Sequence, residues 1–224
     1  MANRAYASIW SKNFSEATVL KQFGRLLEAV PFSAARPGFD ELVIRAVDSA
    51  ETPLVERDLR NHPLDAAGVI SLAREYLHAD SAYEVQAYWD LWVYDSTSGR
   101  WQQRAERLEI ACHGEEYDAG VYAETGHFQA DVGFEHLFTG HAGLLGAHAG
   151  RAASPQHPAE AQFLAVMVRP ENLREYHQRT RENIQKLMDW LRAVEQALPV
   201  EHSRLWSEGE ENFEARLDEI LAVR

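Results

Sequence analysis

Cysteine is nearly absent from this chain, because Cys112 is the only one in 224 residues. A disulfide within the chain needs two cysteines and a cysteine-rich zinc site needs several, so both are excluded. Cys112 follows Leu108 and Ile110 at alternate positions, which places all three on the apolar side of a predicted strand. We therefore predict a buried, unreactive thiol rather than a nucleophile.

Long apolar runs and an excess of positive charge are also missing. The longest uninterrupted apolar run covers residues 163–168, whereas a helix that spans a bilayer needs about 20 apolar residues. The first four residues lead into a predicted strand and not into the apolar core of a signal peptide. The formal net charge is −13, and an acidic surface repels nucleic acid and anionic membranes. We expect a cytoplasmic protein that binds neither nucleic acid nor membrane.

The motifs of common catalytic and cofactor sites are absent as well. There is no His-Glu-x-x-His or His-x-His pattern for a metal, and no Gly-x-Ser-x-Gly turn for a nucleophilic serine. Residues 140–150 are rich in glycine, alanine and histidine, but they lack the Gly-Lys-Ser/Thr ending of a phosphate-binding loop. We expect this segment to be a flexible loop, and the sequence predicts no cofactor.

The strongest pattern that is present lies in residues 83–112. Two stretches of alternating residues flank the short polar segment 95–99, which is typical of a β-hairpin. In the first stretch, one face is apolar and the other mixes aromatic and polar side chains, so we predict a central strand with one face in the core. The apolar face comprises Val85, Ala87, Trp89, Leu91 and Val93, and the mixed face comprises Glu84, Gln86, Tyr88, Asp90, Trp92 and Tyr94.

The elements before the hairpin predict an α+β fold. Residues 5–11 alternate weakly as a first strand, and a helix follows between the N-cap candidate Ser15 and the helix-ending Pro31. Two more strands, a second helix and the first hairpin strand come next. The order over residues 1–94 is therefore β-α-β-β-α-β, which is the ferredoxin-like order of elements.

The remainder of the chain predicts an extended antiparallel sheet and a helical C-terminus. In residues 95–168 we expect further strands, among them 127–134 and 162–168, with a glycine- and histidine-rich loop at 139–158. In residues 169–224 an apolar stripe at helical spacing predicts a long helical hairpin. We predict that the three parts form one compact domain.

Histidine and carboxylate side chains gather after the hairpin. His113 follows one predicted strand, His127 and Asp131 lie on another, and His136 follows it. These residue types bind zinc, manganese or iron, and His127 and Asp131 would share one strand face. The spacing matches no metal motif, so we favour a solvent-exposed acidic edge as the explanation of these residues.

The mixed face of the first hairpin strand is a second candidate site. Tyr88, Asp90, Trp92 and Tyr94 would place aromatic walls and one carboxylate on one side of the sheet. Such a surface suits a small cationic or planar ligand. Core packing beneath a helix, with Asp90 bonded at the sheet edge, explains the same pattern without a ligand.

Three hypotheses for function remain open. The favoured one is a binding or interaction module without catalytic activity, which binds a protein partner or forms a homodimer through the C-terminal helices. The second is a metal-dependent hydrolase that uses the histidine and aspartate ligands named above. The third is a small-molecule binder, with its ligand between the aromatic strand face and a helix.

Overall fold

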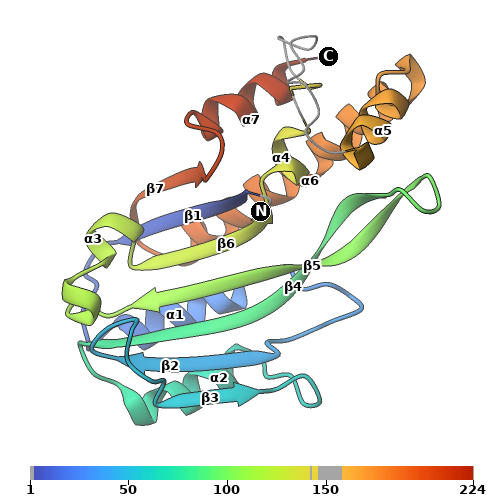
Figure 1. The fold of residues 1–224 in the computed structure, drawn as a ribbon. Helices are drawn as coiled ribbons and strands as arrows, with labels where there is room; N and C mark the ends of the chain where they lie inside the picture. The colour runs from blue at the N-terminus through green and yellow to red at the C-terminus, as the bar shows by residue number, and fades with distance from the viewer. Residues whose placement is uncertain (1–2, 142, 146–157, 224) are drawn as a thin grey trace.

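The computed structural model describes residues 3–141, 143–145 and 158–223 of the chain. A seven-stranded antiparallel sheet lies at its centre, in the order β3-β2-β4-β5-β6-β1-β7 (Figure 1). The α+β class and the extended antiparallel sheet that the sequence predicts are therefore confirmed. The strands are β1 (Arg4–Ser11), β2 (Glu41–Ala46), β3 (Val55–Asp58), β4 (Ser81–Asp95), β5 (Arg100–His113), β6 (Phe128–Phe134) and β7 (Val200–Ser207).

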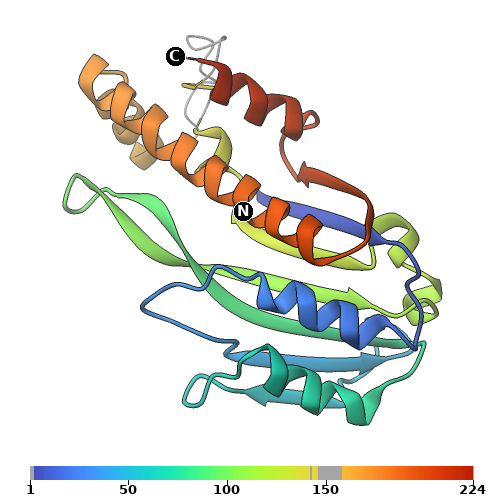
Figure 2. The same cartoon turned by 180° about the vertical axis from the view of Figure 1, so that it is seen from behind.

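Helices cover one face of this sheet. α1 (Val19–Glu28), α2 (Ala66–Ala73) and α6 (Pro170–Ala197) lie behind the sheet in Figure 1 and in front of it in Figure 2. None of the described helices is both long enough and apolar enough to cross a membrane. The other helical segments are α3 (Tyr122–Thr125), α4 (His136–Thr139), α5 (Pro158–Met167), α7 (Phe213–Ala222) and two short 3-10 turns at Arg74–Tyr76 and Tyr117–Ala119.

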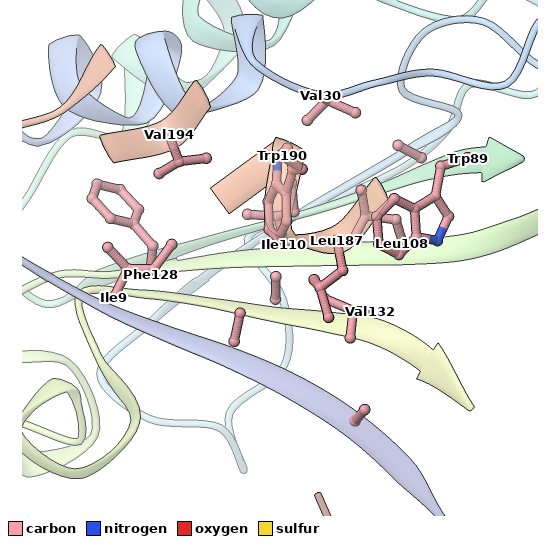
Figure 3. Packing of buried hydrophobic residues seen from close by; sticks show 14 of the residues in the cluster. Ile9, Val30, Trp89, Leu108, Ile110, Phe128, Val132, Leu187, Trp190 and Val194 are labelled. Carbon is pink, nitrogen blue, oxygen red and sulfur yellow. The ribbon is translucent and has the colours of Figure 1, made fainter. Parts of the chain in front are cut away.

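The core fills the space between the sheet and α6 (Figure 3). Alternate side chains of β4 point into it, as the alternation in the sequence predicts, and Trp89 is fully buried. The indole rings of Trp89 and Trp190 pack edge to face with their centroids 6.1 Å apart. The other labelled members of this core are Ile9, Val30, Leu108, Ile110, Phe128, Val132, Leu187 and Val194.

The long C-terminal helix is present and packs on its own sheet. α6 begins at Pro170, whose fixed φ suits a first helical position, and it ends two residues before Pro199. Its apolar stripe, which includes Ile184, Leu187 and Val194, is buried within the one chain. The predicted homodimer was based on this stripe, so it now lacks that argument and stays a prediction.

The pairing of the first four strands differs from the ferredoxin-like expectation. The order β1-α1-β2-β3-α2-β4 occurs along the chain, but β5 and β6 lie between β4 and β1 in the sheet. β4 pairs with β5 along almost its whole length, because a short turn brings these two strands together. The ferredoxin-like arrangement is therefore not confirmed, since an order of elements does not fix which strands become neighbours.

Two predictions for the later part of the chain are wrong. Residues 162–168 were expected to form a strand but mostly belong to α5, because alanine, leucine and methionine favour a helix and a short apolar run does not fix its own period. The predicted helical hairpin is interrupted by β7, which pairs with β1. β7 buries only Leu205, so its alternation is weak. Most of the loop predicted at 139–158 lies outside the described residues.

Candidate functional site

The hairpin of β4 and β5 extends beyond the rest of the sheet (Figure 1). β2 pairs with β4 only as far as Gln86, and β6 pairs with β5 only from Glu109 onward. β4 and β5 nevertheless stay paired with each other to their turn. The outer hairpin, residues 87–108, therefore has no strand on its two outward edges within the described part of the chain. Its outward backbone groups need other hydrogen-bond partners.

The side-chain amide of Asn183 on α6 bonds to two of these groups, the N–H and the carbonyl of Trp92. Its Oδ1 accepts a hydrogen bond from the Trp92 N–H at 2.8 Å, and its Nδ2 donates to the carbonyls of Trp92 and Leu137, both at 3.0 Å. Lys186, three residues further along α6, donates its ammonium to the Asp90 carbonyl at 2.9 Å. Because a buried polar group without a partner costs about 1–3 kcal/mol, these bonds fix α6 across the free edge of β4.

A cavity of about 370 Å³ lies where the outer hairpin meets α4, α5 and α6. Its volume falls in the range of roughly 300–1,000 Å³ that small-molecule sites occupy. Most of the wall is aromatic, and the remainder combines polar and aliphatic side chains. The lining residues are Trp92, Val93, Tyr94, Ser96, Trp101, His136, Leu137, His141, Glu160, Phe163, Tyr176, Thr180 and Asn183.

The aromatic walls come from four elements and contact one another. Trp101 of β5 stacks on Tyr176 of α6 with a centroid distance of 5.3 Å and an interplanar angle of 29°. Tyr94 of β4 lies 5.5 Å from both Trp101 and Phe163 of α5. Phe163 closes the ring of contacts edge-on to Tyr176 at 5.7 Å. Each wall is therefore held by neighbouring rings, which limits its freedom to rotate.

Two stacked histidines form a polar end of the cavity. The rings of His136 and His141 lie 4.3 Å apart. Burial lowers the pKa of both, and burial together with the neighbouring His141 lowers the pKa of His136 to about 3. Both imidazoles are therefore neutral at pH 7. The Tyr176 hydroxyl accepts a hydrogen bond from the His141 backbone N–H at 2.7 Å, and burial raises the pKa of Tyr176, so this hydroxyl stays protonated.

The cavity includes half of the predicted ligand-binding residues. Trp92 and Tyr94 line it, whereas Tyr88 and Asp90 lie outside its lining. The Asp90 carboxylate accepts a hydrogen bond from the Ser33 hydroxyl at 2.6 Å. The guanidinium carbon of Arg36 lies 3.3 Å above the centre of the Tyr88 ring. These two side chains hold the loop between α1 and β2 against the hairpin, so the structure gives them a packing role.

The structure does not bring the four predicted metal ligands together. His113 and His127 lie where β5 ends and β6 begins, and Asp131 lies four residues further along β6, roughly 13 Å away in an extended strand. Asp131 forms an ion pair with Arg4, and His136 lines the aromatic cavity. Within the described residues, no group of three or more His, Cys, Asp or Glu side chains is placed to hold a metal ion. The metal-dependent hydrolase thus has no assembled centre there.

His113 and His127 form a separate pair with its own partners. The His127 Nδ1 accepts a hydrogen bond from the Ser11 N–H at 3.0 Å, and its ring stacks between Phe14 at 4.1 Å and Tyr122 at 4.6 Å. The His113 Nδ1 lies 3.2 Å from a backbone carbonyl. Burial lowers the pKa of both rings, that of His127 to about 4. These contacts give the pair a structural role at the end of the sheet where β5 ends and β6 begins.

A second hollow, of about 420 Å³, lies on the sheet face opposite to α1 and α6. Half of its lining residues are charged, and most of these charges belong to ion pairs within a strand or between neighbouring strands. A polar, solvated outer face is common for an antiparallel sheet that packs on one side only. We therefore assign this hollow to solvent. The ion pairs along it are Arg45–Glu84, Arg107–Glu109 and Arg4–Asp131.

The sequence hypotheses missed most of the cavity wall. Trp101 could have been found, because the hairpin places it directly opposite Tyr94. Tyr176 and Asn183 lie seven residues apart on one helix face, but their periodicity alone predicts only a buried stripe. Phe163 was assigned to a strand, and His141 was assigned to a loop. Nothing local indicates that these segments meet.

Comparisons with protein-family models, with curated proteins and with solved structures found no match. Function therefore has to be argued from the site, because a sheet covered by helices serves many unrelated functions. The aromatic cavity combines an apolar wall with a few converging polar groups, which is the usual composition of a small-molecule site.

Proposed function

We propose that this chain binds a small, planar aromatic molecule in the cavity between the outer hairpin, α5 and α6. The observation that carries the proposal is a cavity of about 370 Å³ walled by rings from four elements. Aromatic faces stack on planar ligands, and each ring pair contributes about 0.5–1.5 kcal/mol beyond the area that it buries.

The rigidity of the wall supports the same proposal. Trp92 is fixed through its backbone by Asn183, and the guanidinium carbon of Arg179 lies 3.8 Å above its ring centre. Trp101 and Tyr176 hold each other by stacking. A ligand that enters such a site loses little affinity to the ordering of side chains. For a ligand of about ten non-hydrogen atoms we expect a Kd between roughly 1 μM and 1 mM.

This proposal corresponds to the third hypothesis from the sequence. It needs no metal, no cofactor and no second copy of the chain. A protein partner and a cytoplasmic location stay predictions from the sequence, and neither conflicts with a small-molecule site. The aromatic cavity is favoured because its geometry is complete within one chain.

Ligand-observed NMR with a set of uncharged aromatic fragments would test the proposal. Ser96 is an exposed lining residue, so Ser96→Phe should fill the mouth of the cavity with little effect on the fold. Its matched control is Thr97→Phe, on the same turn but outside the lining. We expect wild type and Thr97→Phe to bind the same fragments and Ser96→Phe to lose them. Equal binding by Ser96→Phe, or no binding to wild type up to about 1 mM, would refute the proposal.

A further inference from the structure

The polar groups of the cavity differ in how much of their hydrogen-bonding capacity is already used. Asn183 is almost fully used by the backbone of Trp92 and Leu137. Within the described residues, by contrast, the rings of His136 and His141 make no hydrogen bond. A neutral imidazole carries one N–H donor and one nitrogen acceptor. The two rings together can therefore donate to a ligand and accept from it.

The Tyr176 hydroxyl adds a third group with spare capacity. It accepts from the His141 N–H, and its own hydrogen has no acceptor among the residues that the structure describes. Burial raises the pKa of Tyr176, so the hydrogen is retained at neutral pH. This group lies at the junction between the stacked aromatic wall and the histidine end, because Tyr176 contacts both Trp101 and Phe163.

The charges around the cavity disfavour an anion. Among the described residues, the lining contains no lysine or arginine, and Glu160 is its one acidic residue. Arg179, which stacks on Trp92 beside the cavity, already pairs with Glu175 and Glu182. Burial lowers the pKa of both histidines and keeps them neutral. An anion would lose its hydration here and gain no opposite charge, which is a costly exchange.

We infer that the ligand is an uncharged heteroaromatic compound of one or two fused rings, with a hydrogen-bond donor and an acceptor on one edge. Its ring lies among Tyr94, Trp101 and Phe163, and its polar edge faces His136 and His141. This inference rests on the proposed function and adds the chemistry of the ligand to it. A purely apolar ring would leave the histidine nitrogens without partners, and an anionic ring would find no opposite charge in the described lining. A quaternary cationic ring could neither donate a hydrogen bond to the histidines nor accept one from them.

Four probes of nearly the same shape separate these possibilities. They are naphthalene, quinolin-2-one, 2-naphthoate and N-methylquinolinium, measured by equilibrium dialysis at pH 7.5. Quinolin-2-one carries an adjacent N–H donor and carbonyl acceptor and is uncharged. We expect it to bind at least about tenfold more tightly than naphthalene, because two neutral hydrogen bonds of ordinary strength are enough to give a difference of this size. We expect both charged probes to bind more weakly than quinolin-2-one.

Phenylalanine variants identify the side chains that form hydrogen bonds to the polar edge of the ligand. His136→Phe and His141→Phe keep a planar ring and remove the nitrogens. In each we expect the preference for quinolin-2-one over naphthalene to fall towards one, while naphthalene binding is retained. The control is His202→Phe on β7, where His202 is exposed and stacks on Trp10, so the preference should stay unchanged.

The outcomes distinguish this inference from the proposed function. If naphthalene binds as tightly as quinolin-2-one, or if a charged probe binds most tightly, the inference is overturned and the proposed function stands. The same holds if the histidine variants keep the full preference. If neither these probes nor the aromatic fragments bind to wild type, the proposed function itself fails.

Discussion

The two histidine pairs of this protein show how similar local chemistry serves different purposes. His113 and His127 at the end of the sheet, and His136 and His141 beside the outer hairpin, all have pKa values lowered by burial. His127 bonds to Ser11, is enclosed between two rings, and lines neither the aromatic cavity nor the charged hollow. The rings of the second pair line a cavity, and their nitrogens make no hydrogen bond to any described residue. A lowered pKa is therefore not enough to mark a site, and unused hydrogen-bonding capacity beside a cavity is the more selective criterion.

The largest effect on stability should come from the residue that positions the cavity. Asn183→Leu keeps the volume of the side chain but leaves three backbone groups of Trp92 and Leu137 without partners. We expect a loss of roughly 3 kcal/mol or more in the free energy of unfolding, measured with urea. Gln185→Leu on the exposed face of α6 is the control and should change it by less than about 0.5 kcal/mol. A loss below about 1 kcal/mol for Asn183→Leu would show that the hairpin is held by other contacts.

Replacing a histidine of each pair by phenylalanine, which removes the ring nitrogens, tests directly whether the two pairs differ in structural role. His127→Phe leaves the buried Ser11 N–H without an acceptor, so we expect it to destabilise the fold by about 1–3 kcal/mol. His136→Phe removes no hydrogen bond among the described residues and should change stability by less than about 0.5 kcal/mol. Urea unfolding at pH 7.5 measures both. Equal losses would mean that the two pairs play the same structural role.

Acid should destabilise the cavity end through His136. The pKa of this ring is about 3 in the folded chain and about 6.5 in the unfolded chain, so the unfolded chain takes up the proton first. Stability is therefore greatest above pH 6.5 and falls by about 1.4 kcal/mol per pH unit below it, until the folded pKa is reached.

The variant His136→Phe isolates the contribution of His136 to this pH dependence of stability. Between pH 6.5 and 5, wild type should lose roughly 2 kcal/mol more than His136→Phe, as measured by urea unfolding at the two pH values. The neighbouring His141, whose pKa is also lowered by burial, is the same in both proteins. An identical pH dependence would contradict the neutral, buried state of His136.

The smallest effect is expected on the open charged face. Arg45→Gln breaks an ion pair with Glu84 in which the closest atoms are 3.5 Å apart. Partly exposed pairs contribute about 0–1 kcal/mol, so stability should change by no more than that. Fragment binding, followed by ligand-observed NMR, should be unchanged. A loss of binding would show that the ligand binds on this face and not in the aromatic cavity.

The sequence predicts the elements better than their contacts. The alternation in residues 83–112 and the stripe of α6 are local patterns, and both elements are present. Trp92 and Tyr94 were identified because they share a strand face. Tyr88 and Asp90 share the same face but meet the loop between α1 and β2, and periodicity does not encode which segment covers each part of a strand.

The rest of the site depends on contacts between distant segments. His136 was grouped with His127 and Asp131 by proximity in sequence, yet its ring stacks on that of His141, which follows the C-terminal end of α4. Phe163 reaches Tyr94 only because α5 packs over the hairpin. The edge strand β7 buries too little to give a clear alternation. These features follow from tertiary packing, which single-segment patterns do not specify.

The central claim is that the aromatic cavity, and no other surface, binds a planar ligand. Titration of ¹⁵N-labelled protein with the tightest-binding uncharged fragment tests this claim most directly, because each amide and indole reports its own surroundings. The account predicts shifts concentrated on the amides of Trp92, Tyr94, His141 and Tyr176 and on the indole of Trp101. Shifts centred instead on the open sheet face around Glu84, or around His127, would contradict it.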